Sequence, residues 1–211
     1  MSKYDAYFTY SKEILKTLQK NEKTAIFHVP LASDFSVFKK KFNKSKKYPI
    51  SFIGNYDLER ETYLKELLEI NKLFIFGVNW KRKCKNMRLQ PRFYEPKINS
   101  EFCETVQASI VNLNILRQQN KNSQNMRTFE IPACGGFVLH EFSEEVAEMF
   151  EEGRNIEFFR DVNEMNEKIE FYLKNPEKAE IVGENGWKNV SENNHTYAER
   201  VKKIIQIVNS N

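Results

Sequence analysis

The chain has 211 residues, of which 40% are hydrophobic and 29% charged, proportions typical of a globular protein with a hydrophobic core. No apolar run approaches the ~20 residues that a membrane-spanning helix needs, and the segment after Met1 lacks the apolar stretch of a secretory signal. The composition therefore excludes a membrane-spanning helix, and the length allows one large domain or about one and a half small ones.

The excess positive charge, +4 in total, is concentrated in two basic clusters at residues 39–47 and 81–92. Such clusters can bind nucleic acid or an anionic membrane. Because no recognised nucleic acid-binding module accompanies them, we interpret both clusters as solvated loops, and nucleic acid is not an expected partner.

The potential metal ligands are few and scattered. The three cysteines and three histidines are Cys84, Cys103, Cys134, His28, His140 and His195. Neither set has the short spacing of a metal site, so we expect no metal and no resident cofactor. An odd number of cysteines without such spacing predicts reduced thiols and a cytoplasmic location.

The first 48 residues predict a short strand at 6–9, a helix that begins near Ser11, and a second strand at 24–28. The lysine-rich stretch 39–47 resembles a linker. This part is too small to be an independent domain.

From residue 49 onward, short apolar runs alternate with amphipathic stretches. The predicted strands are 50–53, 73–76, 109–113, 137–139 and 156–159. The predicted helices are 57–70, 100–107, a short one near Thr128, 144–150, 161–173, 176–190 and 196–208. Ser143 and Asp161 are expected N-caps. The alternation predicts a doubly wound α/β domain, a parallel sheet covered on both faces.

Ligands of an open parallel sheet bind beyond the carboxyl ends of its strands. Gly54 and Asn55 follow the first of these strands, Arg60 lies in the next helix, and Gly77 follows the second strand. Either glycine has an alternative role as a strand terminator, and Arg60 has an alternative as a surface partner of a neighbouring glutamate.

The stretch 117–141 joins a polar, Asn-rich loop to one acid and a glycine pair. Arg127 offers a guanidinium fork suited to phosphate, and Glu130 can accept hydrogen bonds from ribose hydroxyls. Gly135 and Gly136 are expected to end the short helix and turn the chain into the next strand. These features outline a nucleotide or nucleotide-sugar site, although Arg127 and Glu130 also have the spacing of an ordinary helical ion pair.

Trp80, His140 and the absence of two nucleotide-binding motifs limit the possible kinds of site. Trp80 is more readily a packing residue than a base-stacking platform, and a structural role is favoured for His140 over substrate contact. The chain has no GxxxxGK[ST] or GxGxxG fingerprint, which disfavours kinases, simple NTPases and NAD enzymes.

Four segments resemble the spore-maturation CgeB-type glycosyltransferases, which are similar to the group-1, retaining GT-B enzymes. They are Ser51-Phe52-Ile53-Gly54, Glu59-Arg60-Glu61, Asn125-Met126-Arg127-Thr128-Phe129-Glu130-Ile131-Pro132-Ala133-Cys134-Gly135-Gly136-Phe137, and His195-Thr196-Tyr197 with Arg200. The likeness extends from about Tyr4 to the C-terminus.

The resemblance implies the C-terminal, donor-binding half of a GT-B fold. Of the Glu-x7-Glu pair at the donor site, Glu130 matches the second acid, which holds the ribose, whereas the first falls at Asn122. The phosphate-binding pair falls at Asn55 and Arg60, of which only Arg60 is charged, so Arg127 is expected to supply the rest. The residues expected to bind the nucleotide-sugar are Gly54, Asn55, Arg60, Asn125, Met126, Arg127, Thr128 and Glu130. No catalytic side chain is assigned.

The same resemblance divides the chain into 1–48, the end of an acceptor domain with the crossover linker, and 49–211, the donor domain. It implies transfer of a sugar from a nucleotide-sugar to an unidentified acceptor. The alternatives are an inactive nucleotide-sugar-binding subunit that needs a partner chain for the acceptor half and, more weakly, a basic RNA-binding protein.

Overall fold

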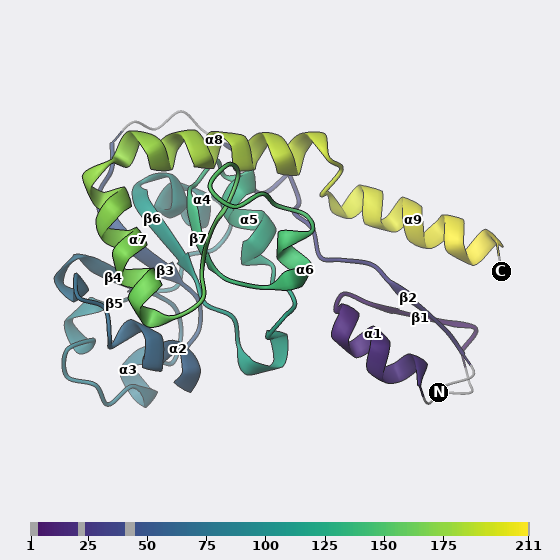
Figure 1. The fold of residues 1–211 in the computed structure, drawn as a ribbon, viewed down its shortest axis with the longest axis horizontal. Helices are drawn as coiled ribbons and strands as arrows, with labels where there is room; N and C mark the ends of the chain where they lie inside the picture. The colour runs from purple at the N-terminus through teal and green to yellow at the C-terminus, as the bar shows by residue number, and fades with distance from the viewer. Residues whose placement is uncertain (1–3, 21–23, 41–44, 211) are drawn as a thin grey trace.

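The computed structural model describes residues 4–20, 24–40 and 45–210, which form two parallel sheets (Figure 1). The smaller sheet pairs β1 (Ala6–Thr9) with β2 (Ala25–His28), and α1 (Lys12–Gln19) connects them. We call β1, α1 and β2 the N-terminal lobe. It lies beside the larger sheet, to its right in Figure 1.

The larger sheet has six parallel strands in the order β5-β4-β3-β6-β7-β8. Their bounds are β3 Tyr48–Ile53, β4 Leu73–Phe76, β5 Phe93–Tyr94, β6 Ser109–Asn114, β7 Val138–Glu141 and β8 Glu157–Phe159. The chain moves outward from β3 to β5 and then crosses back to β6, so the direction of winding reverses between β3 and β6. This confirms the predicted doubly wound sheet and locates its topological switch point.

Helices cover both faces of this sheet. Their bounds are α2 Leu58–Leu64, α3 Trp80–Lys83, α4 Asn99–Gln107, α5 Arg127–Ala133, α6 Glu144–Ala147, α7 Val162–Lys174, α8 Pro176–Glu192 and α9 Tyr197–Ser210, with 3-10 turns at Ile70–Lys72, Gln90–Arg92 and Gln118–Asn120. Strand β3 shows why both faces are apolar: Ile50 and Phe52 pack against α2 and α7, whereas Ile53 faces α4 and α5. Successive strand residues point to opposite faces, so a doubly covered strand needs a continuous apolar run.

The predicted helix over 57–70 is wrong in its second half. Helix α2 ends at Leu64, and hydrogen bonds from Glu66 N to Tyr63 O (3.1 Å) and from Leu67 N to Leu64 O (3.4 Å) tighten the chain into turns. This change of path buries Leu67 and Ile70 in the core. Burial of two large side chains outweighs the local helical pattern.

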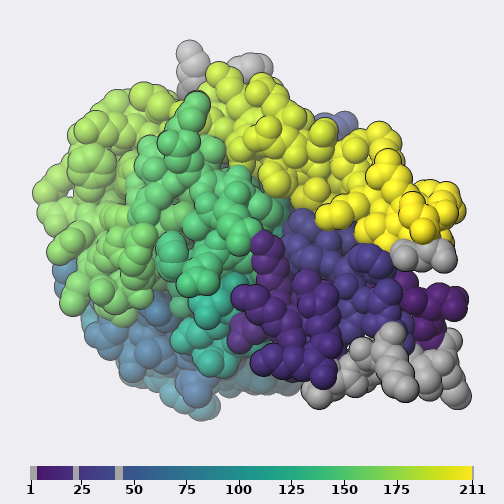
Figure 2. Space-filling model, turned by 45° about the vertical axis from the view of Figure 1, so that its right-hand side comes forward, coloured from purple at the N-terminus to yellow at the C-terminus, as the bar shows by residue number. Residues whose placement is uncertain are grey.

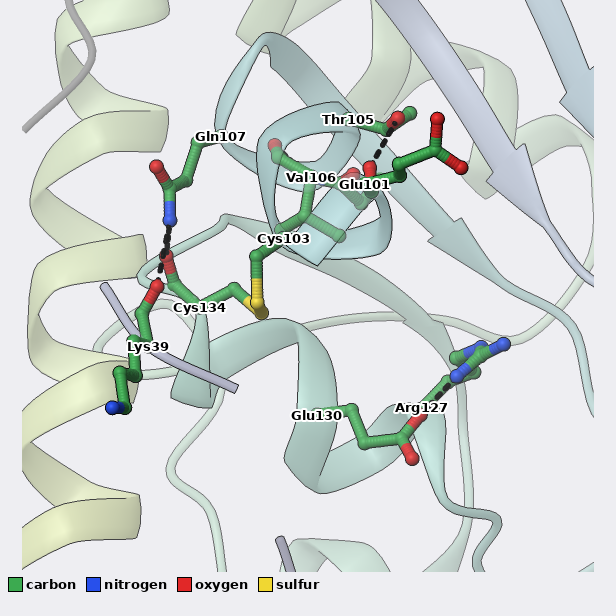
Figure 3. Close-up of a disulfide and its surroundings, with 10 residues drawn as sticks. Lys39, Glu101, Cys103, Thr105, Val106, Gln107, Arg127, Glu130 and Cys134 are labelled. Carbon is green, nitrogen blue, oxygen red and sulfur yellow. Dashed lines mark hydrogen bonds and ion pairs between the residues drawn. A yellow bond between two sulfur atoms is a disulfide. The ribbon is translucent and has the colours of Figure 1, made fainter. Parts of the chain in front are cut away.

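The prediction of reduced thiols is wrong for two of the three cysteines. Cys103 on α4 and Cys134, directly after α5, form a disulfide across 31 residues of sequence, with Cα atoms 5.2 Å apart (Figure 3). The packing of α4 beside the end of α5 brings the two sulfurs together, which no sequence spacing signals. Cys84 is a buried free thiol, and burial raises its pKa to about 11.

The expected caps and helix end are confirmed. Ser143 accepts from Val146 N, and Asp161 accepts from Asn163 N and Glu164 N. Gly135 has φ +78°, the left-handed conformation that lets the chain leave α5.

Side chains of the two basic clusters form ion pairs and hydrogen bonds with the rest of the protein, unlike those of fully solvated loops. In the first, of which 41–44 lie outside the described residues, Lys40 pairs with Glu184 and Lys46 Nζ donates to Gln107 O (3.0 Å). In the second, Arg88 and Arg92 donate to backbone carbonyls of the domain. Within the described ranges, no helix is long and apolar enough to cross a membrane.

Helix α9 crosses back from the six-stranded domain to the N-terminal lobe, and its surface lies against the lobe in Figure 2. Arg200 Nε donates to Pro30 O (3.0 Å), and Lys203 Nζ donates to His28 O (3.3 Å). The two ends of the chain therefore meet in one region. The predicted domain boundary after residue 48 stays a prediction.

Candidate functional site

The carboxyl ends of β3 and β4 lie next to the switch point. Gly54 N donates to Phe76 O (2.9 Å), and a Cβ added to Gly77 would lie 2.1 Å from Gly54 O. Only glycine fits this approach at position 77, so its structural role is confirmed. Trp80 is also structural: it is 1% exposed, and its indole N–H donates to Gly54 O (2.8 Å).

Arg60 lies directly behind this edge and is buried. Its Nε donates to Ile115 O (3.0 Å) and an Nη donates to Asn55 O (3.1 Å), so the guanidinium ties the loops after β3 and β6 together. Burial, and then the like charges of Arg117 and Arg127, lower its pKa to about 10, which leaves it charged at neutral pH. The alternative of a surface pair with a neighbouring glutamate is wrong.

Arg127, the second residue expected to bind phosphate, begins α5 next to the same edge. Its Nε donates to Ile53 O (3.1 Å), and its guanidinium lies 4.2 Å from the centre of the Phe102 ring. It also pairs with Glu130, as the helical spacing allows (Figure 3). Glu130 is mostly buried, and its Oε2 atom makes this pair. The structure thus brings Arg60, Arg127 and Glu130 to one edge of the sheet.

The start of α5 is held by its own polar side chains and by Asn114 at the end of β6. Asn125 N donates to Thr128 Oγ1 (3.3 Å), Thr128 N donates to Asn125 Oδ1 (3.2 Å), and the amides of Asn114 and Asn125 donate to each other. Two of the residues expected to bind the nucleotide-sugar therefore make structural contacts, since Asn125 and Thr128 fix the helix against β6. Met126 differs, because its side chain is 52% exposed.

His140 is fully buried at the end of β7. Its Nε2 meets Thr128 Oγ1 (2.9 Å) and its Nδ1 meets Glu141 O (2.5 Å). Burial lowers its pKa to about 4 despite the hydrogen bond to the carbonyl, so the ring is neutral at pH 7. The favoured structural role is confirmed.

Glu141 was missed by the sequence interpretation, although it ends an apolar strand run as a buried acid. Its carboxylate accepts from Leu116 N (2.9 Å) and from the Tyr63 hydroxyl (3.3 Å). Burial raises its pKa, partly opposed by the Leu116 N–H. Together with Arg60, which binds Ile115 O, it fixes the start of the β6–α5 loop.

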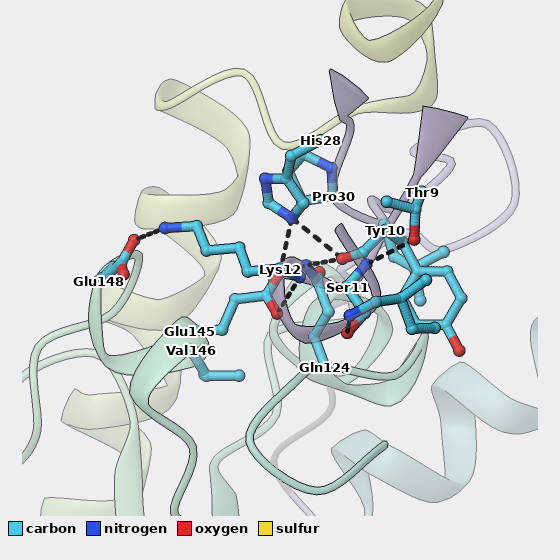
Figure 4. Close-up of polar contacts among 12 residues, drawn as sticks. Thr9, Tyr10, Ser11, Lys12, His28, Pro30, Gln124, Glu145, Val146 and Glu148 are labelled. Atoms are coloured by element: carbon cyan, nitrogen blue, oxygen red, sulfur yellow. Dashed lines mark hydrogen bonds and ion pairs between the residues drawn. The ribbon is translucent and has the colours of Figure 1, made fainter. Parts of the chain in front are cut away.

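A second polar cluster joins the N-terminal lobe to α6 and was also missed (Figure 4). Glu145 Oε1 lies 2.7 Å from both His28 Nε2 and Gln124 Nε2, and Lys12 N donates to its Oε2 (3.2 Å). Burial raises the pKa of Glu145, but the hydrogen bonds from His28 and Gln124 outweigh it and leave the pKa lowered. We call these residues the lobe junction.

Asn122, where the resemblance leads one to expect an acid, lines a cavity of about 290 Å³ beside this junction. Its φ is 57°, a left-handed conformation that asparagine adopts far more readily than glutamate. The departure from the Glu-x7-Glu pattern therefore has a backbone reason.

The parallel sheet and its switch point define the class of the molecule, a Rossmann-like α/β domain. A family model described as glycosyl transferase-like matches residues 60–206. The chain therefore belongs to this glycosyl transferase-like family of group-1 glycosyltransferases. No curated protein matches it at a significant level.

Solved structures match the fold closely despite low identity. The C-terminal domain of a glycosyl transferase group 1 family protein (LpcC) from Francisella tularensis is 12% identical, with 76% of this chain and 97% of that one covered and a TM-score of 0.58. The sucrose-phosphate synthase of Thermosynechococcus elongatus is 15% identical over 98% of this chain and 58% of its own, with a TM-score of 0.71. Alr3699/HepE of Anabaena, solved in complex with UDP-glucose, is 10% identical over 98% and 64%, with a TM-score of 0.74.

These likenesses show the fold alone, that of the C-terminal domain of GT-B glycosyltransferases. The chain spans about three-fifths of the length of the synthase and of HepE.

Proposed function

We propose that this chain is the donor-binding part of a glycosyltransferase and that a nucleoside diphosphate-sugar binds at the switch point between β3 and β6. The observation that carries the proposal is the family match over residues 60–206. The arrangement of the site supports it, since Arg60 and Arg127 lie where the strands of an open parallel sheet present their ligands. We retain the CgeB-type resemblance as part of this proposal.

The Anabaena relative solved with UDP-glucose makes a uridine nucleotide the first donor to test. Departure of the sugar leaves growing negative charge on the diphosphate, and fixed cationic groups stabilise that charge. The arginines at the switch point supply such groups. No side chain is assigned as a nucleophile or as a general acid or base.

In this proposal Glu130 holds the ribose. Its Oε2 atom is paired with Arg127, which leaves Oε1 for a ribose hydroxyl while the ion pair persists. Arg127 then holds Glu130 in a fixed orientation, and charge-assisted hydrogen bonds are the stronger ones.

The test compares UDP with 2′-deoxy-UDP by calorimetry. We expect the wild-type protein to prefer UDP, and Glu130→Ala to lower UDP affinity by roughly tenfold or more and to abolish the preference, because a charge-assisted hydrogen bond is lost. Glu151→Ala, which removes an exposed acid on the loop before β8, is the matched control. Unchanged UDP affinity in Glu130→Ala would refute the ribose role, and absence of binding to any nucleoside diphosphate or its sugar would refute the function.

A second candidate, donor binding without independent turnover, is favoured by the surface of the lobe. Two parallel strands alone are a marginal sheet, and α9 exposes a stripe of Val201, Ile205 and Val208, each more than half exposed. We propose that a further protein segment carrying the acceptor site covers this region. Sugar transfer or donor hydrolysis by the 211-residue chain alone would contradict this candidate.

A further inference from the structure

Three arginines of the described chain converge at the switch point: Arg60, Arg117 and Arg127. Arg60 follows β3, Arg117 follows β6, and Arg127 begins α5, so all three reach the same edge from different elements. They are close enough for Arg117 and Arg127 to lower the pKa of Arg60 in addition to the effect of burial. Asp57 and Glu141 offset part of this repulsion, and an anionic ligand would offset more of it.

Two of the three guanidinium groups already form hydrogen bonds within the protein. Arg60 donates to Ile115 O and Asn55 O, and Arg127 donates to Ile53 O and pairs with Glu130. These contacts hold the loops and the start of α5 in place. Both arginines therefore contribute charge to the site while their N–H groups are partly used by the protein.

Arg117 is different. Its Nε atom is buried, yet it has no hydrogen-bond partner among the described residues. The nearest acid, Asp57, lies 3.7 Å from Nε through its Oδ2 atom, beyond hydrogen-bonding distance, while its Oδ1 atom caps α2 by accepting from Glu59 N (3.1 Å). Unpaired buried donors are uncommon in native proteins, so the lack of a partner for Arg117 Nε needs an explanation.

The other acids at this edge have partners of their own. Glu59 pairs with Lys121 (2.8 Å), Glu130 pairs with Arg127, and Glu141 accepts from Leu116 N. None of these acids hydrogen-bonds to Arg117, whose ion pair within the described chain is the 3.7 Å contact with Asp57, so a ligand anion can supply a closer acceptor. Its side chain is 38% exposed, so the end of the guanidinium is open to one.

The position of Arg117 is also fixed in advance. The two preceding residues are held by the protein, Ile115 through Arg60 and Leu116 through Glu141. An arginine on a loop anchored in this way loses less freedom when it binds an anion, which favours affinity.

We propose that Arg117 binds the distal, sugar-bearing phosphate of the nucleoside diphosphate and so distinguishes a diphosphate from a monophosphate. The proposal rests on the proposed function for the identity of the ligand. The planar guanidinium fork matches two phosphate oxygens, and the anion neutralises the charge that Arg60, Arg117 and Arg127 share.

The experiment measures binding of UDP, UMP, uridine and inorganic pyrophosphate to the wild-type protein and to Arg117→Gln. Arg154→Gln, which removes an exposed arginine from the loop before β8, is the matched control, and Arg117→Lys keeps the charge without the fork. Thermal melting of each variant without ligand reports on folding.

We expect Arg117→Gln to lose at least tenfold in affinity for UDP and for pyrophosphate, with little change for uridine and UMP. Arg117→Lys should recover part of the loss. Because the substitution removes a like charge beside Arg60, we expect the melting temperature of the ligand-free variant to stay the same or rise.

Other outcomes overturn the proposal or separate it from the proposed function. Wild-type affinity for UDP in Arg117→Gln overturns it and leaves the proposed function standing, as does an equal loss for all ligands with a lower melting temperature. Pyrophosphate binding that depends on Arg117, without any nucleotide binding, supports the phosphate role and overturns the proposed function. Failure of the wild-type protein to bind either pyrophosphate or a nucleotide overturns both.

Discussion

The six-stranded domain and the N-terminal lobe are stabilised in different ways. In the domain, fully buried side chains such as Phe52 and Phe129 fill both faces of the sheet. In the lobe, helix α1 has no buried residue along its described length, and the contacts with the domain include the polar cluster of Glu145, His28 and Gln124. Apolar burial itself depends little on pH, so the pH dependence of each region comes from its own buried ionisable groups, His140 in the domain and Glu145 at the junction.

This difference suits a domain that keeps its shape and a lobe whose attachment includes a few polar contacts. The switch-point arginines lie on loops anchored to the domain, so we expect their arrangement to be independent of the lobe. Three predictions test how far the two regions differ.

The largest expected effect concerns the domain. Removal of the Cys103–Cys134 disulfide, by Cys103→Ser with Cys134→Ser or by reduction, should lower the free energy of unfolding by about 2–4 kcal/mol, because the bond closes a loop of about 31 residues in the unfolded chain. Chemical denaturation with and without reductant measures the effect. The Cys84→Ser variant is the control for loss of a buried thiol that is not in the disulfide. A loss of domain stability no larger in the double variant than in this control would break the comparison.

The next prediction concerns the different pH dependence of stability in the six-stranded domain and the N-terminal lobe. His140 in the domain has its pKa lowered to about 4, so the unfolded chain binds its proton first, and stability present above pH 6.5 falls by about 1.4 kcal/mol per pH unit between 6.5 and 4. Burial also lowers the pKa of His195, beside α9, to about 4, so its effect on stability has the same sign. The pKa of Glu145 is lowered. Its contribution to folding stability is therefore present above the ordinary pKa of 4.5 and is lost only as the pH falls below that value.

Hydrogen exchange at several pH values should therefore show domain amides losing protection below pH 6.5, with the Glu145 contribution to the lobe lost only below pH 4.5. Glu145→Gln should lower protection of β1 and β2 at neutral pH, by about 1–3 kcal/mol locally, with little change in the domain. Equal loss of protection in both regions of this variant would show that they unfold as one unit.

The smallest effect lies between the two regions, at Asn122. Asn122→Glu, which restores the acid of the Glu-x7-Glu pattern, should cost up to about 1 kcal/mol because its φ is 57°, while Asn122→Gly should be neutral or slightly stabilising. Thermal denaturation of the two variants checks the order. A more stable Asn122→Glu would show that backbone conformation does not explain the asparagine.

Much of the six-stranded domain could be predicted because its signals are local. The apolar runs at Tyr48–Ile53 and Ser109–Asn114, the caps Ser143 and Asp161, and the turn at Gly135 all depend on a few neighbouring residues. The edge strand Phe93–Tyr94 escaped prediction because two residues carry no periodicity.

The sequence predicted that Arg60, Arg127 and Glu130 lie near one edge of the sheet, but it did not predict their contacts, and their binding role stays a prediction. Arg60, Arg127 and Glu130 do reach one edge, yet the carbonyls that hold the two arginines, the contacts of the buried Glu141 and the Glu145 junction depend on residues 21 to 133 positions away along the chain. Such pairings form only when separate loops pack together, and no local pattern encodes them.

By itself, the sequence determined the kind of domain, because strand and helix periodicity, caps and glycines act over a few residues. It also determined which residue types follow each strand. Only the tertiary structure decided the strand order that creates the switch point, the disulfide between α4 and the end of α5, and the lack of a hydrogen-bond partner for Arg117 Nε among the described residues. Those features depend on distances between elements remote in the chain, which packing of both sheet faces sets.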